Sequence, residues 1–126
     1  MIAKAQPMSE VFKDITNPDD FSYAIRDFVD RFNETPLASL IEEEPPFLAD
    51  QIGDNIADAW LAATAVYLCQ KHGIKTPKWT HNNARALKDP WFAAETQAMR
   101  AILLQDSPAP FRVRNLFVSG NVLSRA

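Results

Sequence analysis

The sequence predicts an all-α fold of about four to five helices with a partly irregular C-terminal segment, in a single compact domain over residues 1–126. Three observations lead to this prediction. Apolar residues recur at helical spacing through most of the chain. Only three glycines stand against nine prolines, which favours helices joined by proline-bearing loops over hairpins. A chain of 126 residues that is 47% hydrophobic has the size and composition to bury one core.

The N-terminal third carries two clear helix-start signals. A short helix is expected over residues 9–15, and Asn17-Pro18 then places a capping residue before a proline at the first helical position. Thr35-Pro36 repeats that signal for a turn or two ending near Glu43, before Pro45-Pro46 breaks the helical path. After Asn17, apolar residues at spacings of four, three and four predict an amphipathic helix with an aromatic seam. These residues are Phe21, Ile25, Phe28 and Phe32.

The strongest helical pattern begins at about Asp50 or Asp54 and ends at His72. Its apolar stripe is wide, which predicts that this helix lies at the centre of the fold. Gly73 suits the left-handed position that follows a helix, and His72 suits the negative end of the helix dipole. Cys69 falls on the apolar stripe, where a buried thiol stays protonated and inert, so we expect it to pack in the core.

The C-terminal part alternates proline-bearing connectors with shorter helical patterns. Residues 74–79 form a connector, and a short helix capped by Thr80 is expected to run through Leu87. Asp89-Pro90 is another start signal, which predicts a helix that includes Trp91 and continues to Leu103. No apolar period extends far in residues 111–126, so a helical turn, an extended strip and a terminal turn are expected there.

Composition excludes several classes of protein. The single cysteine rules out an intramolecular disulfide, so the fold does not depend on an oxidising compartment. The charged N-terminus does not resemble a signal peptide, and the longest apolar stretch, residues 57–69, is shorter than the roughly 20 residues that span a bilayer. We therefore expect a cytoplasmic protein that does not enter a membrane.

No constellation of residues predicts catalysis. The two histidines, His72 and His81, flank a proline-bearing connector and lack the spacing of a metal site, so no metal is expected. Glycine-rich phosphate loops and nucleophile elbows are absent from the sequence, so no cofactor is expected either. The consecutive carboxylates of residues 42–44 diverge and favour a solvated acidic loop. The sequence therefore favours a protein that is not an enzyme.

Charge is divided unevenly between the two halves. Residues 1–60 carry four Lys or Arg and thirteen Asp or Glu, a net charge of −9, whereas residues 61–126 carry nine and three, a net charge of +6. Such halves attract each other within one chain or across a homodimer, and we favour these interpretations. The alternative is a nucleic-acid-binding regulator that contacts phosphates with its basic half. The basic residues in question are Lys71, Lys75, Lys78, Arg85, Lys88, Arg112 and Arg114.

Six residues are candidates for binding a protein partner. The aromatic ones follow prolines beside basic residues and either anchor an interface or cover a small core. Arg112 and Arg114 can fork hydrogen bonds to carboxylates while neighbouring apolar residues (Phe111, Leu116, Phe117) bury. Alternatively the two arginines form, with Asn115, an exposed site for an acidic partner or a nucleic acid. The six candidates are Trp79, Trp91, Phe92, Arg112, Arg114 and Asn115.

Roughly the last 70 residues resemble a family of small bacterial helical proteins of unknown function, loosely associated with toxin–antitoxin gene pairs. The resemblance implies a cytoplasmic bacterial protein and supplies no catalytic residue. Its most distinctive part is residues 111–118, and the first 50 residues show no such likeness. The segments that carry it are His72-Gly73-Ile74, Pro77-Lys78-Trp79, Leu87-Lys88-Asp89-Pro90-Trp91-Phe92, the run from Ser107-Pro108 to Val118, and Leu123-Ser124-Arg125-Ala126.

Together these observations favour a non-enzymatic protein–protein interaction module. It would be dimeric and would present a helical surface to an unidentified protein partner, as the neutralising member of a toxin–antitoxin-like pair does. This hypothesis expects an exposed apolar or aromatic patch with a polar rim. The nucleic-acid-binding regulator is the second hypothesis, and it expects affinity that falls steeply with salt.

Overall fold

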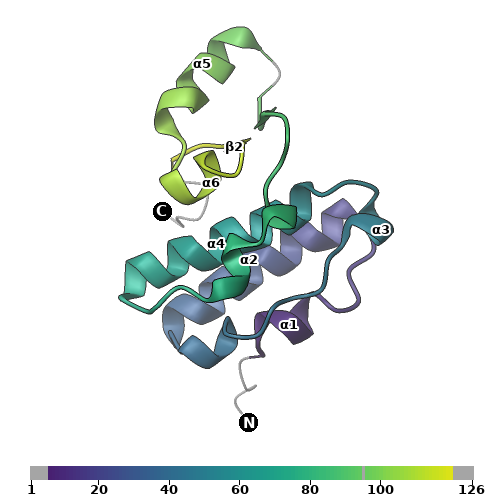
Figure 1. Ribbon diagram of the computed structural model, residues 1–126, viewed down its shortest axis with the longest axis vertical. Coiled ribbons are helices and arrows are strands. Elements are labelled where there is room, and N and C mark those ends of the chain that lie inside the picture. Colours follow the sequence, from purple (N-terminus) through teal and green to yellow (C-terminus); the bar gives the residue numbers. More distant parts are fainter. Residues whose placement is uncertain (1–5, 95, 121–126) are drawn as a thin grey trace.

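A computed structural model describes residues 6–94 and 96–120, and these residues are mostly helical (Figure 1). They form six α-helices, three short 3-10 helices and one two-stranded parallel sheet. Three of the α-helices are only four residues long, which is why the number exceeds the four to five expected. The elements are α1 (Met8–Val11), α2 (Pro18–Glu34), η1 (Ala38–Leu40), α3 (Ala49–Ile52), α4 (Ile56–His72), η2 (Lys78–His81), η3 (Asn83–Arg85), β1 (Trp91–Phe92), α5 (Gln97–Asp106), α6 (Ala109–Arg112) and β2 (Leu116–Phe117).

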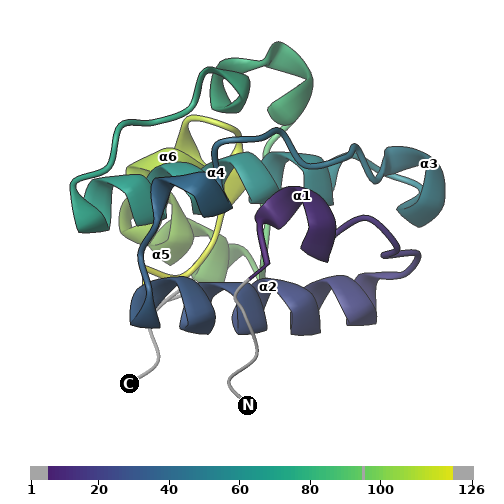
Figure 2. The ribbon, with the colours of Figure 1, turned by 90° about the horizontal axis from the view of Figure 1, so that it is seen from below.

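Two helices of 17 residues, α2 and α4, lie side by side and in parallel at the centre of the fold (Figures 1 and 2). Their C-terminal ends meet where a ring nitrogen of His72 is 2.8 Å from the side-chain oxygen of Asn33. Parallel neighbours require a long connection, and residues 35–55 supply it with η1 and α3. Asn17 caps α2 as expected, because its side chain accepts a hydrogen bond from the backbone N–H of Asp20.

Helix α4 is the central helix that the sequence predicts. Eleven of its 17 residues are buried, and α2, α3, α6 and the 3-10 helices η2 and η3 all contact it. A helix that is apolar nearly all round has to be covered on every side. It ends at Gly73, whose φ of 67° is the left-handed conformation that glycine adopts without steric cost.

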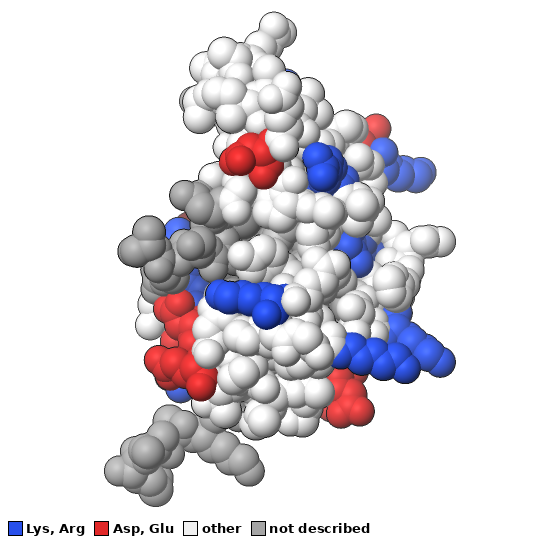
Figure 3. Space-filling view, turned by 90° about the vertical axis from the view of Figure 1, so that its left-hand side faces the viewer, with Lys and Arg blue, Asp and Glu red and all other residues white. Residues whose placement is uncertain are grey.

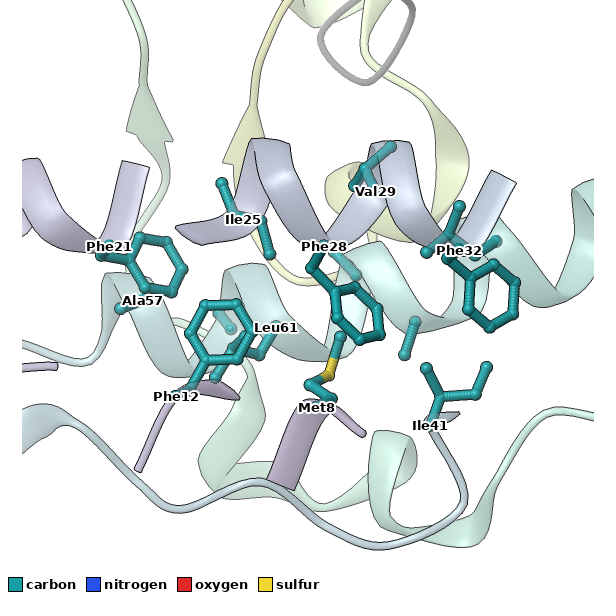
Figure 4. Packing of buried hydrophobic residues seen from close by; sticks show 14 of the residues in the cluster. Met8, Phe12, Phe21, Ile25, Phe28, Val29, Phe32, Ile41, Ala57 and Leu61 are labelled. Carbon is teal, nitrogen blue, oxygen red and sulfur yellow. The ribbon is translucent and has the colours of Figure 1, made fainter. Parts of the chain in front are cut away.

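The core fills the layer between α2, α4 and α1 (Figure 4). The aromatic seam of α2 points into this layer, and the Phe12 ring lies 5.6 Å from the Phe21 ring between centroids. Phe28 and Phe32 stack at 6.0 Å farther along α2. Met8 of α1 also packs in this core. The helix α1 is shorter than the helix expected over residues 9–15.

Gly53 explains why the sequence offers two starts for the central helix, at Asp50 and at Asp54. The helical pattern after Asp50 forms the short helix α3, which ends at Gly53 with a φ of 102°. A new helix then begins at Ile56, whose backbone N–H donates to the Asp54 side chain at 3.0 Å. The left-handed glycine therefore divides one apolar pattern into two helices.

The prediction of a helix beginning at Asp89-Pro90 is wrong. Trp91 and Phe92 form β1, which pairs in parallel with β2, so that Trp91 lies opposite Leu116. The helix α5 begins only at Gln97, where the Thr96 side chain accepts a hydrogen bond from a backbone N–H. The helix-start signal of Asp89-Pro90 acts only on neighbouring residues. The backbone hydrogen bonds that residues 91–93 form with β2 and Asn115 outweigh it.

The C-terminal segment matches two of its three expected parts. The helical turn is α6, in which Phe111 is buried, and the extended strip is β2, in which Leu116 and Phe117 are buried. The terminal turn and the stretch from Leu123 onward lie outside the described residues. The short helix expected over residues 80–87 is replaced by the 3-10 helices η2 and η3, and the expected turn before Glu43 is η1.

Candidate functional site

Helix α5 is the most exposed helix of the described chain. Nine of its ten residues are exposed, and Leu103 is the exception. Five of the nine exposed residues of α5 are apolar, and the other four are Gln97, Arg100, Gln105 and Asp106. Its large exposed apolar residues are Met99 (51% exposed), Ile102 (62%) and Leu104 (49%), and together we call them the α5 apolar surface.

The position of α5 leaves this surface open to solvent. Figure 1 places α5 at the end of the molecule farthest from α1, beyond the layer of α2 and α4. In Figure 3 the tip of this end of the molecule is uncharged, and red and blue side chains lie directly below it. Three large apolar side chains are exposed on α5, a helix to which the sequence analysis assigned no binding residue.

Hydrogen bonds hold both ends of α5 in place. At its start the Thr96 hydroxyl accepts from the Met99 N–H at 3.2 Å. At its end the Ser107 hydroxyl bonds to the backbone of Val118, donating to the carbonyl at 3.0 Å and accepting from the N–H at 2.9 Å. An isolated helix of ten residues is marginal in water, so these contacts and the buried Leu103 keep α5 helical.

A cavity of about 420 Å³ opens between α2, α3, the first turns of α4, and β1. Its walls are largely apolar. Trp60 and Trp91 meet edge to face at 6.1 Å, and Trp60 also contacts Phe111 at 5.2 Å. The indole N–H of Trp60 is buried and has no hydrogen-bond acceptor among the described residues.

Three charged side chains line the same cavity. Arg26 projects from α2, and its guanidinium forms no hydrogen bond or ion pair with the described residues. Asp54 accepts the hydrogen bond from the Ile56 N–H, and the Asp30 side chain also has an interaction partner. Among the three charged residues of this cavity, Arg26 is therefore the one whose guanidinium N–H donors have no acceptor among the described residues.

The two halves of unlike charge meet at Arg85, whose side chain is fully buried. Its guanidinium donates to the Glu44 carboxylate at 3.2 Å and to the Pro45 carbonyl, and it lies 4.0 Å from the Asp58 carboxylate. The Phe47 ring covers it at 4.0 Å from the ring centroid. One contact between the two halves is thus made within one chain, and Arg85 is not at the surface to contact phosphate.

Burial sets the protonation behaviour of this pair. Burial raises the pKa of Asp58 above its usual value, while a hydrogen bond from the Leu48 N–H and the charge of Arg85 oppose that rise. Burial lowers the pKa of Arg85, and its hydrogen bond to Glu44 opposes the decrease. The contacts of Arg85 join η3 to α4 and the acidic loop.

Trp79 belongs to the same cluster. Its indole N–H donates to the Ile41 carbonyl at 2.9 Å, and the Arg85 guanidinium lies 5.2 Å from its ring. The side chain is half-buried, as expected for an aromatic residue that covers a small core. In this position Trp79 attaches the connector after α4 to the loop that follows η1.

The residues predicted from the 111–118 segment separate in space. Arg112 is exposed at the end of α6, but Arg114 is buried and donates to the carbonyls of Pro110 at 2.8 Å and Thr80 at 2.7 Å. Burial lowers the pKa of Arg114. Asn115 adopts a left-handed φ of 63°, and its amide donates to the Leu87 carbonyl at 2.8 Å. The segment is thus docked by carbonyl acceptors and not by the carboxylates that were expected.

Trp91 and Phe92 lie between the central layer and α5. Trp91 forms part of the cavity wall, and Phe92 stacks on Phe117 with centroids 4.8 Å apart. Arg100 of α5 sits over the Phe92 ring at 5.5 Å. Both aromatic residues are half-buried, so neither stands alone as an exposed anchor.

The basic half presents fewer cations at the surface than its sequence offers. Arg85 and Arg114 are buried, whereas the four lysines of the predicted set and Arg112 are exposed. On the face drawn in Figure 3, basic side chains lie apart from one another with uncharged surface between them. Within the described residues no group of three His, Cys, Asp or Glu is placed to hold a metal.

Comparisons of the chain with protein-family models, with curated proteins and with solved structures gave no match. The resemblance to a bacterial family therefore stays a prediction. Among the described residues, no helix has both the length and the apolar character needed to cross a membrane.

Two features of the site were not found by sequence reasoning. The sequence predicts a helix here but no exposed surface on it, although Ala101 to Leu104 are four apolar residues in succession, more than one buried face accommodates. The cavity gathers residues from α2, α3, α4 and β1, and no sequence spacing connects them.

Proposed function

We propose that this chain is a non-enzymatic protein–protein interaction module whose recognition element is α5. The observation that supports the proposal is the exposure of Met99, Ile102 and Leu104 on one short helix. Exposed apolar surface of this kind is a feature of interfaces in proteins that otherwise keep such residues inside.

The structure of α5 suits recognition by a groove. An amphipathic or apolar helix commonly binds by placing side chains at spacings of three and four residues into pockets of its partner. Met99 and Ile102 have that spacing and point from one side of α5, with Leu103 adjacent and already buried in the chain itself. Fixed ends at Thr96 and Ser107 present the helix in one orientation, which lowers the entropy lost on binding.

The partner is an apolar protein surface, on a second copy of the chain or on another protein. A toxin-like partner, as the sequence resemblance implies, and a homodimer are both compatible with this interface. The nucleic-acid alternative depends on lysines that are exposed but scattered, and phosphate-binding sites collect several such charges on one face.

The test compares three forms of the protein: wild type, Ile102→Glu and the control Gln105→Glu. Both substitutions add one carboxylate to an exposed position of α5, but only the first changes the apolar surface. Each tagged form is incubated with nuclease-treated and untreated lysate of the source organism, and sedimentation velocity on purified protein gives its self-association up to about 100 μM.

We expect wild type and Gln105→Glu to self-associate, or to capture one protein in stoichiometric amounts after nuclease treatment. Ile102→Glu should lose at least about tenfold in affinity, because a carboxylate is desolvated in an apolar interface. Equal behaviour of Ile102→Glu and wild type contradicts the proposal. Capture of nuclease-sensitive material alone transfers the function to the exposed lysines.

A further inference from the structure

We propose that the cavity between α2, α4 and β1 is a binding site for a small amphipathic monocarboxylate. The apolar body of the ligand fills the space against Trp60 and Trp91, and its carboxylate binds the guanidinium of Arg26. This site contains no residue of α5, so the inference is independent of the proposed interaction function.

The size of the cavity sets the size of the ligand. Its volume of about 420 Å³ lies within the range of roughly 300–1,000 Å³ that small-molecule sites occupy. At about 30 Å³ for each group of the size of a water molecule, it holds roughly fourteen non-hydrogen atoms. A carboxylic acid with a chain of eight to twelve carbons, or an aromatic acid of similar size, has these dimensions.

The walls select an apolar body. Phe21, Ile25 and Val29 supply one side from α2, and Ile56 supplies the opposite side from α4. The two tryptophans, which contact each other edge to face, offer a flat aromatic boundary. Burying a chain against these groups removes apolar surface from water on both sides, which is the main source of affinity in such sites.

The charges at the rim select an acidic head group. Arg26 has five N–H donors and no acceptor for its guanidinium among the described residues. Asp54 already accepts from the first turn of α4, and Asp30 is also engaged. A carboxylate head group adds a charge-assisted pair to Arg26, the one side chain of this rim whose donors have no acceptor among the described residues.

The surrounding charge limits the head group to one negative charge. Residues 1–60, which supply most of the cavity, carry a net charge of −9. A phosphate ester would bring nearly two negative charges into this field, and Arg26 offers only one positive charge to oppose them. A monocarboxylate balances Arg26 one to one.

The test uses three ligands that share one apolar chain: octanoate, 1-octanol and octylammonium. Binding is followed by NMR on protein labelled with ¹⁵N, through the indole N–H signals of the three tryptophans. Trp60 and Trp91 border the cavity, whereas Trp79 lies outside it and donates to Ile41. A ligand in the cavity should shift the first two signals and leave the third unchanged.

Two variants and one control locate the ligand. Arg26→Gln removes the proposed carboxylate partner from an exposed position, and Arg31→Gln removes an exposed arginine of the same helix that does not border the cavity. Ser22→Trp places a large side chain at an exposed position in the cavity wall, so it blocks the space without disturbing the core.

We expect octanoate to bind wild type and Arg31→Gln alike, at least about tenfold more tightly than octylammonium. Arg26→Gln should weaken octanoate about tenfold and leave 1-octanol unchanged, because only the acid uses the guanidinium. Ser22→Trp should abolish the shifts with all three ligands. Each variant is first shown to unfold at the wild-type temperature, so that lost binding is not lost folding.

Three outcomes overturn the inference. No saturable shift of Trp60 or Trp91 at octanoate concentrations up to about 5 mM means that the cavity is not a ligand site. Equal affinity of Arg26→Gln and wild type for octanoate refutes the assigned head group. Shifts that persist in Ser22→Trp place the ligand elsewhere. None of these results bears on Ile102→Glu, so a failure here is distinct from a failure of the interaction proposal.

Discussion

Replacing Arg85 by methionine is expected to be among the most destabilising single changes in this chain. Methionine keeps much of the volume of the side chain but removes its charge and all its donors. The Asp58 carboxylate, which is 1% exposed, then loses the cation 4.0 Å away. Breaking a buried charge pair by removing one partner costs about 3–5 kcal/mol, because the other charge stays buried and uncompensated.

This cost is large against the total stability. A domain of this size has a free energy of unfolding of roughly 5–15 kcal/mol, so Arg85→Met should remove about a fifth of it or more. The melting temperature should fall by roughly 10–20 °C. Urea denaturation at pH 7.5 measures the free energy. Arg31→Met is the matched control: Arg31 pairs with Asp27 at the surface, and losing that pair should cost less than about 1 kcal/mol.

The effect of pH on Arg85→Met identifies the cause. The charge of Arg85 lowers the pKa of Asp58, so its loss raises that pKa further above the usual 3.8. A carboxyl whose pKa is higher in the folded state stabilises the protein as pH falls through that folded pKa, because the folded chain then binds the extra proton. The destabilisation by Arg85→Met should therefore be smaller at pH 5 than at pH 7.5.

A double-mutant cycle completes the test. Asp58→Asn keeps a side-chain oxygen to accept the Leu48 N–H, but it cannot be charged. Arg85→Met combined with Asp58→Asn should be less destabilising than the sum of the single changes by at least about 1 kcal/mol. Additive effects, a cost for Arg85→Met below about 1 kcal/mol at pH 7.5, or no dependence on pH would refute the reasoning.

Two further predictions concern α5 and the core thiol. Thr96→Ala removes the hydrogen bond from the Met99 N–H, which should cost about 1 kcal/mol and accelerate amide hydrogen exchange in α5 while α4 exchanges at its wild-type rate. Exchange that increases equally in both helices would contradict the view that α5 is held mainly by its ends. Burial raises the pKa of the Cys69 thiol, so an aromatic disulfide reagent should react with it at least about a hundredfold more slowly in the native protein than in 6 M guanidinium. Similar rates in the two states would place Cys69 at the surface.

The local signals of the sequence predicted the central pair of helices well. Asn17-Pro18 caps α2, and Gly73 ends α4, because both features act within a few residues along the chain. The apolar period of α2 predicted the core-facing residues for the same reason, since a helix presents every third or fourth residue to one side.

The candidate site was predicted less well, because most of its residues act across long separations. Arg114 was expected to bind carboxylates, but it donates to the carbonyl of Thr80, 34 residues away. The sequence predicts Trp91 on a helix. In the structure its backbone N–H donates to the backbone carbonyl of Asn115, and Trp91 is part of a strand. Only the division of charge between the halves anticipated a long-range contact, and it indicated attraction without naming Arg85.

By itself, therefore, the sequence determined the mainly helical class, the ends of α2 and α4, and the absence of a disulfide from the fold. Helix propensity, capping and apolar period are properties of neighbouring residues, so they can be read along the chain. Only the tertiary structure decided that Arg85 is buried between two acids, that α5 remains uncovered, and that a cavity opens beside Arg26. These outcomes depend on which distant segments meet, and on which apolar surface is left without a partner once they have met.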